Sequence, residues 1–181
     1  MKHYLLNVWR IIDPIYYNFT KLEYVTDHRD NKTIFRVRLT KYKGSNIVLG
    51  DGTSILKNDL LLKIHLHNAR MIRELKKANS EMNRAVLIYH MIRNDLQCLS
   101  RYVQTHNRHH DIKAIIGITM LCKGTGRLGF ETAPIRNTCY RFLKKASFLP
   151  ISFIANASSR NPPVYLFMSK NRLLNQFNHF G

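Results

Sequence analysis

The feature that most limits the fold of this chain is a change in hydrophobic spacing along it. From Ile34 to Tyr42, apolar and polar residues alternate, which is the pattern of a strand with one covered face. From Ser80 to about Thr105, apolar residues recur every three or four positions, as along one side of a long helix. The sequence therefore predicts an α+β fold, in which a single mixed sheet packs against helices.

The strand-rich part predicts an antiparallel meander. The strand at Ile34–Tyr42 is followed by two short apolar runs, Ile47–Leu49 and Ser54–Leu56, with Gly50-Asp51-Gly52 between them. An Asp-Gly pair in this setting is a strong signal for a β-hairpin. Leu60–Leu66 then predicts a further strand.

Helices and a central strand follow the meander. Ala69–Ala78 predicts a short helix, and Ser80 is expected to cap the long helix that ends near Thr105. Ile112–Leu121 is apolar on both faces, as expected of a buried central strand. The predicted buried stripe of the long helix is Met82, Ala85, Val86, Tyr89, Ile92, Leu96, Leu99 and Val103. The later predicted elements are a helix over Thr138–Phe148, a strand over Val164–Met168, and a terminal helix that Ser169 caps and that runs to Phe177.

The length and composition suit one domain over residues 1–181, with 45% hydrophobic and 22% charged residues. We expect an amphipathic helix in residues 1–20 and an α+β core in residues 21–181. The helix, from Tyr4 to about Tyr17, is expected to pack on its own domain, although its aromatic residues also suit a membrane interface. No run approaches the roughly 20 apolar residues of a transmembrane helix.

Charge is the unusual quantity. The chain has 29 Lys and Arg against 11 Asp and Glu, a formal net charge of +18. Because such an excess repels itself, we expect a polyanionic partner: nucleic acid, an anionic membrane surface or an anionic cell-envelope polymer. A merely solvated cationic surface is the alternative. The region from Ile112 to Gly181 has ten basic residues and a single acid, Glu131, which we expect to pair with Arg127 or Arg136.

Cysteine usage points to a reducing compartment. Cys98, Cys122 and Cys139 have no close spacing and are odd in number, which argues against a disulfide framework. The first 20 residues are interrupted by polar and charged positions and do not read as a signal peptide. We therefore expect a cytoplasmic protein, free or peripheral to the inner face of the membrane.

Two arginines on the first long strand are candidates for binding anions. Arg36 and Arg38 share a strand face with Tyr42. On strand platforms for single-stranded nucleic acid, cations hold phosphates and aromatic rings stack on bases. A solvated sheet face fits the same pattern.

A glycine loop at Gly124–Gly129 matches the pattern G-x-G-x-x-G. A dinucleotide site would need a helix opening there and an acidic residue about 20 positions further on. Pro134 limits the helix and no Asp or Glu follows Glu131, so we exclude that site. An anion-binding loop helped by Lys123 and Arg127 stays open beside a plain turn, which we favour.

Two histidine patterns resemble parts of metal sites, but neither is complete. His65 and His67 lie on one face of a predicted strand and offer two ligands without an identifiable third. His106 and His110 have H-x-x-x-H spacing at the end of the long helix. We expect local structural roles for these histidines, and no metal or cofactor. Cys122 lies at a strand end without an identifiable base, and no nucleophile motif stands elsewhere in the sequence.

Three stretches carry a resemblance to a known family. The first runs from Leu39 to Thr53 and continues with Asn58-Asp59 and Lys63–Asn68. The second is Gly117–Leu121 followed by Arg127–Glu131, and the third is Tyr165–Ser169. Together they resemble the YkoP-like domain of Gram-positive bacteria, over nearly the whole chain. The resemblance implies a domain that occurs alone or behind polysaccharide deacetylases, and it assigns no activity to that domain.

Within this resemblance, the residues that match motif positions are His65, Asn68, Gly129, Phe130 and Glu131. The chain departs from the family at Asn58-Asp59, where Gly-Asp is usual. The loop around Gly124 varies in the family, which weakens the case for a phosphate loop. Deacetylase chemistry is not implied, because it needs a paired-aspartate motif and the sequence has no Asp-Asp pair.

The sequence leads to two functional hypotheses. We favour a binding or accessory domain that recognises an anionic polymer or surface through the basic C-terminal third together with Arg36, Arg38, Lys123 and Arg127. The deacetylase fusions favour a cell-envelope polymer or lipid headgroups, and the charge suits nucleic acid equally. The alternative is a small enzyme of the transferase type, with one pocket formed by His65, Asn68 and Glu131.

Overall fold

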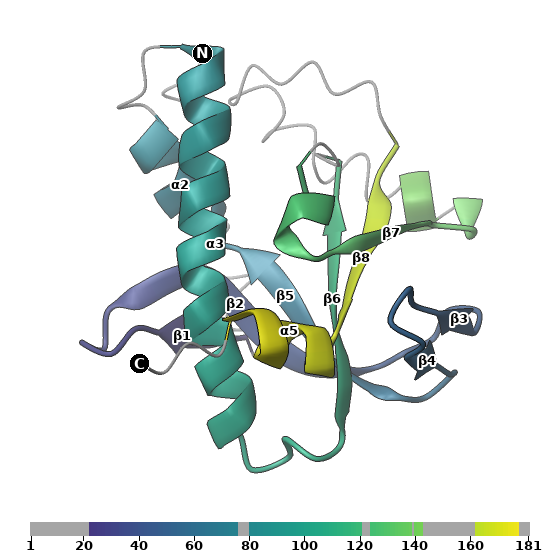
Figure 1. Ribbon diagram of the computed structural model, residues 1–181. Coiled ribbons are helices and arrows are strands. Elements are labelled where there is room, and N and C mark those ends of the chain that lie inside the picture. Colours follow the sequence, from purple (N-terminus) through teal and green to yellow (C-terminus); the bar gives the residue numbers. More distant parts are fainter. Residues whose placement is uncertain (1–21, 76–79, 121–123, 139, 143–161, 178–181) are drawn as a thin grey trace.

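The computed structural model describes residues 22–75, 80–120, 124–138, 140–142 and 162–177, which form a six-stranded sheet with helices packed on it (Figure 1). In spatial order its strands are β1 (Glu23–Thr26), β2 (Lys32–Lys41), β5 (Leu60–Leu66), β6 (Ile112–Thr119), β8 (Val164–Ser169) and β7 (Glu131–Pro134). The central pair β5–β6 is parallel, whereas the other pairs in this sheet are antiparallel.

The parallel pair requires a long connection, because the chain must return to the same end of the sheet. Two helices supply it, α2 (Asn68–Leu75) and α3 (Glu81–Thr105). Ser80 caps α3 as predicted, since its side chain accepts a hydrogen bond from the Asn83 N–H at 3.1 Å. In the described parts of the chain, no helix is long and apolar enough to span a membrane.

One face of the sheet is covered by α3 and by the C-terminal helix α5 (Lys170–Phe177) (Figure 1). The core between them includes Phe35, Val37, Leu62, Ile115, Met168, Leu96, Leu99 and Leu173. A hydrogen bond also ties α3 to β2, because the Ile34 N–H donates to the Asp95 carboxylate at 2.7 Å. Burial raises the pKa of Asp95.

A two-stranded ribbon, β3 (Ile47–Val48) and β4 (Ser54–Ile55), supplies the cover for part of the opposite face. Leu61, Ile116 and Phe167 point to this face, because successive strand residues alternate in direction. Leu49 and Ile55 pack on them from the ribbon. The Phe167 ring also meets the Tyr42 ring edge-on, with 5.8 Å between the ring centres.

The expected α+β fold, with its long helix and its buried central strand, is confirmed. The predicted hairpin forms as a separate two-stranded sheet, so β2 pairs directly with β5. The helix expected in residues 1–20 lies outside the described residues. The helix expected over Thr138–Phe148 is helical at 138 and 140–142, and its later part lies outside the description. Sequence reasoning did not predict β1 and β7, which have four residues each and lie at the sheet edges.

The predicted buried stripe of α3 is wrong in its first half. Leu96, Leu99 and Val103 are fully buried, whereas Met82 is 74% exposed and Val86 is 48% exposed. A helix of 25 residues is about 38 Å long, and an eight-residue strand such as β6 about 27 Å. The N-terminal half of α3 therefore extends past the sheet, beside α2 (Figure 1).

We expect Leu99→Ala to lower the free energy of unfolding by about 3 kcal/mol, because it leaves a cavity between α3 and the sheet. Met82→Ala in the same helix is the matched control and should change it by less than about 0.5 kcal/mol. Urea unfolding followed by circular dichroism measures both. Equal losses would contradict the division of α3 into a covered and an uncovered half.

Candidate functional site

Three parts of the chain that are distant in sequence meet at the β7 edge of the sheet. They are the turn after β3, the first residue of β7, and the junction of β8 with α5. The Gly50 N–H donates to both carboxylate oxygens of Glu131, at 3.0 and 2.9 Å. The Arg172 guanidinium donates to the same carboxylate at 3.1 Å. Glu131 therefore joins the hairpin turn to α5. The sequence had suggested Arg127 or Arg136 as its basic partner, but the structure gives Arg172.

Ser169 makes a second link between the same parts. Its hydroxyl accepts a hydrogen bond from the Arg172 N–H at 2.9 Å, which caps α5 as predicted. It also donates to the Asp51 carboxylate. Asp51 accepts a further hydrogen bond from the Thr53 N–H at 3.0 Å. The hydrogen bond from Ser169 is the main cause that holds the pKa of Asp51 below its usual value.

Gly129 allows α5 to approach this cluster closely. It follows η1 (Gly126–Leu128), and its φ of +88° lies in the left-handed region that favours glycine. A side-chain carbon at this position would lie 2.5 Å from Gln176 Oε1 and 3.5 Å from Arg172 Nε. The missing side chain therefore leaves room for both residues of α5.

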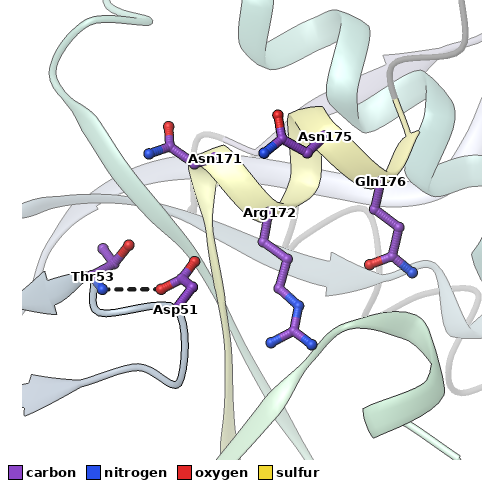
Figure 2. Close-up of a pocket in the computed structure, with 6 residues that line it drawn as sticks. All are labelled: Asp51, Thr53, Asn171, Arg172, Asn175 and Gln176. Atoms are coloured by element: carbon purple, nitrogen blue, oxygen red, sulfur yellow. Dashed lines mark hydrogen bonds between the residues drawn. The ribbon is translucent and has the colours of Figure 1, made fainter.

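A polar hollow of about 520 Å³ opens beside the cluster, between the hairpin turn and α5. Figure 2 shows Arg172 and Gln176 extending from α5 in one direction, with Asp51 and Thr53 on the hairpin across from the helix. All six lining side chains have hydrogen-bonding groups: Asp51, Thr53, Asn171, Arg172, Asn175 and Gln176. The two charged members are already bonded within the protein, so the hollow suits a polar ligand better than an apolar one.

The four basic residues predicted to bind anions have different surroundings. Arg36 is only 4% exposed; its guanidinium donates to the Tyr24 hydroxyl at 2.7 Å. The alternation predicted that Arg36 lies on an open strand face. That prediction is wrong, because both faces of β2 are covered there. Arg38 is half-buried on β2 and Arg127 is exposed on η1. Lys123 lies outside the described residues.

The structure does not bring the residues of the enzyme hypothesis into one pocket. His65 lies on β5, Asn68 begins α2, and Glu131 begins β7. Because β6 and β8 separate β5 from β7, His65 and Glu131 lie on strands about 14 Å apart at the usual strand spacing. His65 is instead the cross-strand neighbour of Arg36.

In the second half of the glycine loop, from Arg127 to Gly129, the N–H groups bond within the loop. The Arg127 N–H donates to the Gly124 carbonyl at 3.2 Å, and the Gly129 N–H donates to the Gly126 carbonyl at 3.0 Å. The loop leads through η1 into β7. An anion-binding loop would need these N–H groups to point at its ligand.

The histidines have local surroundings. His106 caps the end of α3, and its ring accepts a hydrogen bond from the N–H two residues further on, at 3.0 Å. The rings of His109 and His110 lie 3.7 Å apart, and His67 meets Tyr24 edge-on. Within the described residues, no group of three or more His, Cys, Asp or Glu side chains is placed to hold a metal ion.

Sequence reasoning missed Asp51 and Arg172 as members of a site. The hairpin signal identified Asp51 as a turn residue, and the cap signal identified Ser169, so each received a local role. Their hydrogen bond joins residues 118 positions apart, which no local pattern reveals. The isolation of Glu131 in a basic region was the one signal that pointed to this cluster.

We expect Glu131→Gln to lower the free energy of unfolding by about 1 kcal/mol, because it removes a charge-assisted contact that joins distant segments. Asp111→Asn is the control, since its pair with Arg108 is exposed and local and should contribute less than about 0.5 kcal/mol. Urea unfolding measures both variants. A loss no larger for Glu131→Gln than for the control would show that the contacts of Glu131 with Gly50 and Arg172 add nothing to stability.

Asp51 is expected to titrate below the usual range of aspartate, and Ser169→Ala should raise its pKa towards that range. Because the pKa of Asp51 is lower in the folded than in the unfolded chain, its carboxylate stabilises the fold above the unfolded pKa. This contribution is lost as the pH falls through the folded value. Carboxyl NMR measures the titration, and Asp27, whose pKa is lowered mainly by Asn31, should not respond. An unchanged Asp51 titration would exclude the serine as its donor.

Comparison with known proteins places the chain in a family. The family described as "YkoP domain" matches residues 2–177. The "Uncharacterized protein YkoP" of Bacillus subtilis (strain 168) is 46% identical over 177 residues, which covers 96% of each chain. No solved structure matches the chain. Because the similarity extends over almost its whole length, the chain belongs to the YkoP domain family.

Proposed function

We propose that this protein is a binding module for an anionic polymer or surface. The observation that carries the proposal is the way in which the described carboxylates are used. Several of them bond to backbone N–H and hydroxyl groups and hold the fold together. The formal net charge of +18 counts every carboxylate, so the basic side chains outnumber all possible counter-charges in the chain by 29 to 11.

The hydrogen bonds of the carboxylates support this view. Asp27 accepts the N–H groups of Arg29 and Asn31, at 2.8 and 2.9 Å, and Asp59 accepts that of Leu56 at 2.8 Å. The other described carboxylates that accept backbone N–H groups include Asp51, Asp95 and Glu131. A carboxylate placed in this way fixes a turn or a helix contact, and screening limits its effect on distant cations.

Exposed basic side chains lie on many parts of the described surface. They include Arg29, Lys41, Lys43, Lys57, Arg73, Arg93, Lys113, Arg127, Arg136 and Arg141. Their summed field attracts polyanions and raises the rate of encounter with them. Of the residues predicted to bind, Arg127 is exposed and stays a candidate for direct contact. Arg36 instead bonds to Tyr24 within the fold.

The proposed location is the cytoplasm, including the inner face of the membrane. Nucleic acid and anionic lipid are the polyanions of that compartment. An anionic cell-envelope polymer has the same sign of charge and is the third proposed ligand. In the described part of the chain, β6 and β8 separate the strands of His65 and Glu131, so the geometry there does not add support for a transferase.

We expect the purified protein to bind at least one of four labelled ligands at micromolar concentration or tighter: duplex DNA, single-stranded DNA, a soluble anionic wall polymer, or anionic vesicles. The affinity should fall at least about tenfold between roughly 50 and 200 mM salt, because each neutralised phosphate releases counterions. Fluorescence anisotropy and vesicle sedimentation measure it. Dextran and phosphatidylcholine vesicles are the neutral controls. Failure to bind any of the four ligands in a salt-dependent way would refute the proposal.

A further inference from the structure

The hairpin formed by β3 and β4 has one covered face and one exposed apolar face. Ile47 and Ile55 face the sheet, so alternation along the strands turns Val48, Ser54 and Leu56 outward. Val48 is 71% exposed and Leu56 is 49% exposed. Two large aliphatic side chains therefore lie in water on one short hairpin, where a partner would gain by covering them.

The hairpin is firmly attached to the rest of the molecule. Its turn is hydrogen-bonded to β7 and to the β8–α5 junction. Its inner face is anchored by Ile55, at 0% exposure, and by Leu49, at 5%. Val48 and Leu56 are therefore presented on a fixed platform, and their exposure does not depend on a loose loop.

Basic side chains stand where the chain enters and leaves the hairpin. Lys41, Lys43 and Lys57 are all exposed. The Asn58 N–H donates to the Tyr42 carbonyl at 2.8 Å, which places the segments of Lys43 and Lys57 side by side. The apolar face is thus flanked by three exposed cationic side chains whose stems can lie along a surface.

Positive charge predominates around this hairpin. Arg136 lies close enough to Tyr42 to oppose the effect of burial, which raises the pKa of that tyrosine. Two carboxylates lie on the same segment, Asp51 and Asp59, and both accept hydrogen bonds from the protein. With Glu131 and Arg172 at the turn included, five basic side chains stand against three carboxylates, and all three carboxylates accept hydrogen bonds from the protein.

We propose that the β3–β4 hairpin is the surface by which this protein docks on an anionic lipid bilayer. Val48 and Leu56 enter the boundary between headgroups and acyl chains, and Lys41, Lys43 and Lys57 contact lipid phosphates and carboxylates. The inference rests on the proposed function and names its partner.

A bilayer fits this surface better than nucleic acid does. The phosphate backbone of nucleic acid would engage the lysines, but it offers no apolar layer to the outer face of the hairpin. A bilayer offers an anionic surface and an apolar layer a few ångströms beneath it. The combination of exposed aliphatic and basic side chains is what favours lipid.

The test is sedimentation of the full chain with vesicles of phosphatidylcholine containing phosphatidylglycerol, at fixed salt. Val48→Ser with Leu56→Ser should weaken binding about tenfold, because both apolar contacts are lost. The matched control is Met82→Ser with Phe142→Ser. These two side chains lie elsewhere on the molecule and are 74% and 72% exposed. The control should stay within about threefold of the unmodified chain.

A second pair of variants tests the charges. Replacing Lys41, Lys43 and Lys57 by Gln should weaken vesicle binding at least about tenfold, since each basic residue near the surface contributes. The control replaces Arg29, Arg73 and Arg93 by Gln, so both variants lose the same net charge. Circular dichroism and urea unfolding of all four variants confirm that each is folded.

The outcomes separate this inference from the proposed function. Larger losses in the hairpin variants than in their controls support it. Equal losses in hairpin and control variants would overturn the docking surface, while anion binding as such would stand. Tight binding to DNA with none to anionic vesicles would overturn the bilayer as partner and leave the binding module intact. Binding to none of the four anionic ligands, the wall polymer included, would overturn both the docking surface and the proposed function.

Discussion

The parallel pairing of β5 with β6 is the constraint on which the rest of the structure depends. An antiparallel neighbour can follow a strand after a short turn, but a parallel one requires the chain to cross back over the sheet. The crossing is made by α2 and α3, and it lays the C-terminal half of α3 over one face. The opposite face is then available to the β3–β4 hairpin, which completes a second core around Leu61 and Phe167.

Polar contacts at the β7 edge lock this arrangement. Carboxylates are scarce in the chain, and two of them, Asp51 and Glu131, lie at the joint between the hairpin, β7 and α5. Each accepts hydrogen bonds from N–H or hydroxyl donors that its own element cannot supply. The joint therefore specifies where the hairpin sits, whereas the apolar core alone would only require that something cover the sheet. The same joint forms one wall of the polar hollow.

Local patterns predicted the elements, and contacts between distant segments decided the rest. The cap at Ser80 and the apolar spacing after it gave both ends of α3, and Leu60–Leu66 matches β5 as predicted. The burial of Arg36 could not be predicted, because it depends on what covers the second face of β2. The exposure of Met82 depends on the length of α3 relative to the sheet. The pairing of Glu131 with Arg172 depends on strand order, which periodicity does not encode.

The long sequence separation within the joint has a consequence for biosynthesis. Gly50 and Glu131 are 81 positions apart, and Asp51 and Ser169 are 118 apart. A ribosome therefore releases the hairpin well before it releases the elements that hold it. The Asp-Gly turn can close at once, and Leu61 and Ile116 can cover part of its inner side as soon as β5 and β6 have formed. Phe167 and the hydrogen bond from Ser169 arrive only with β8, so completion of the C-terminus is what finishes an element near the start.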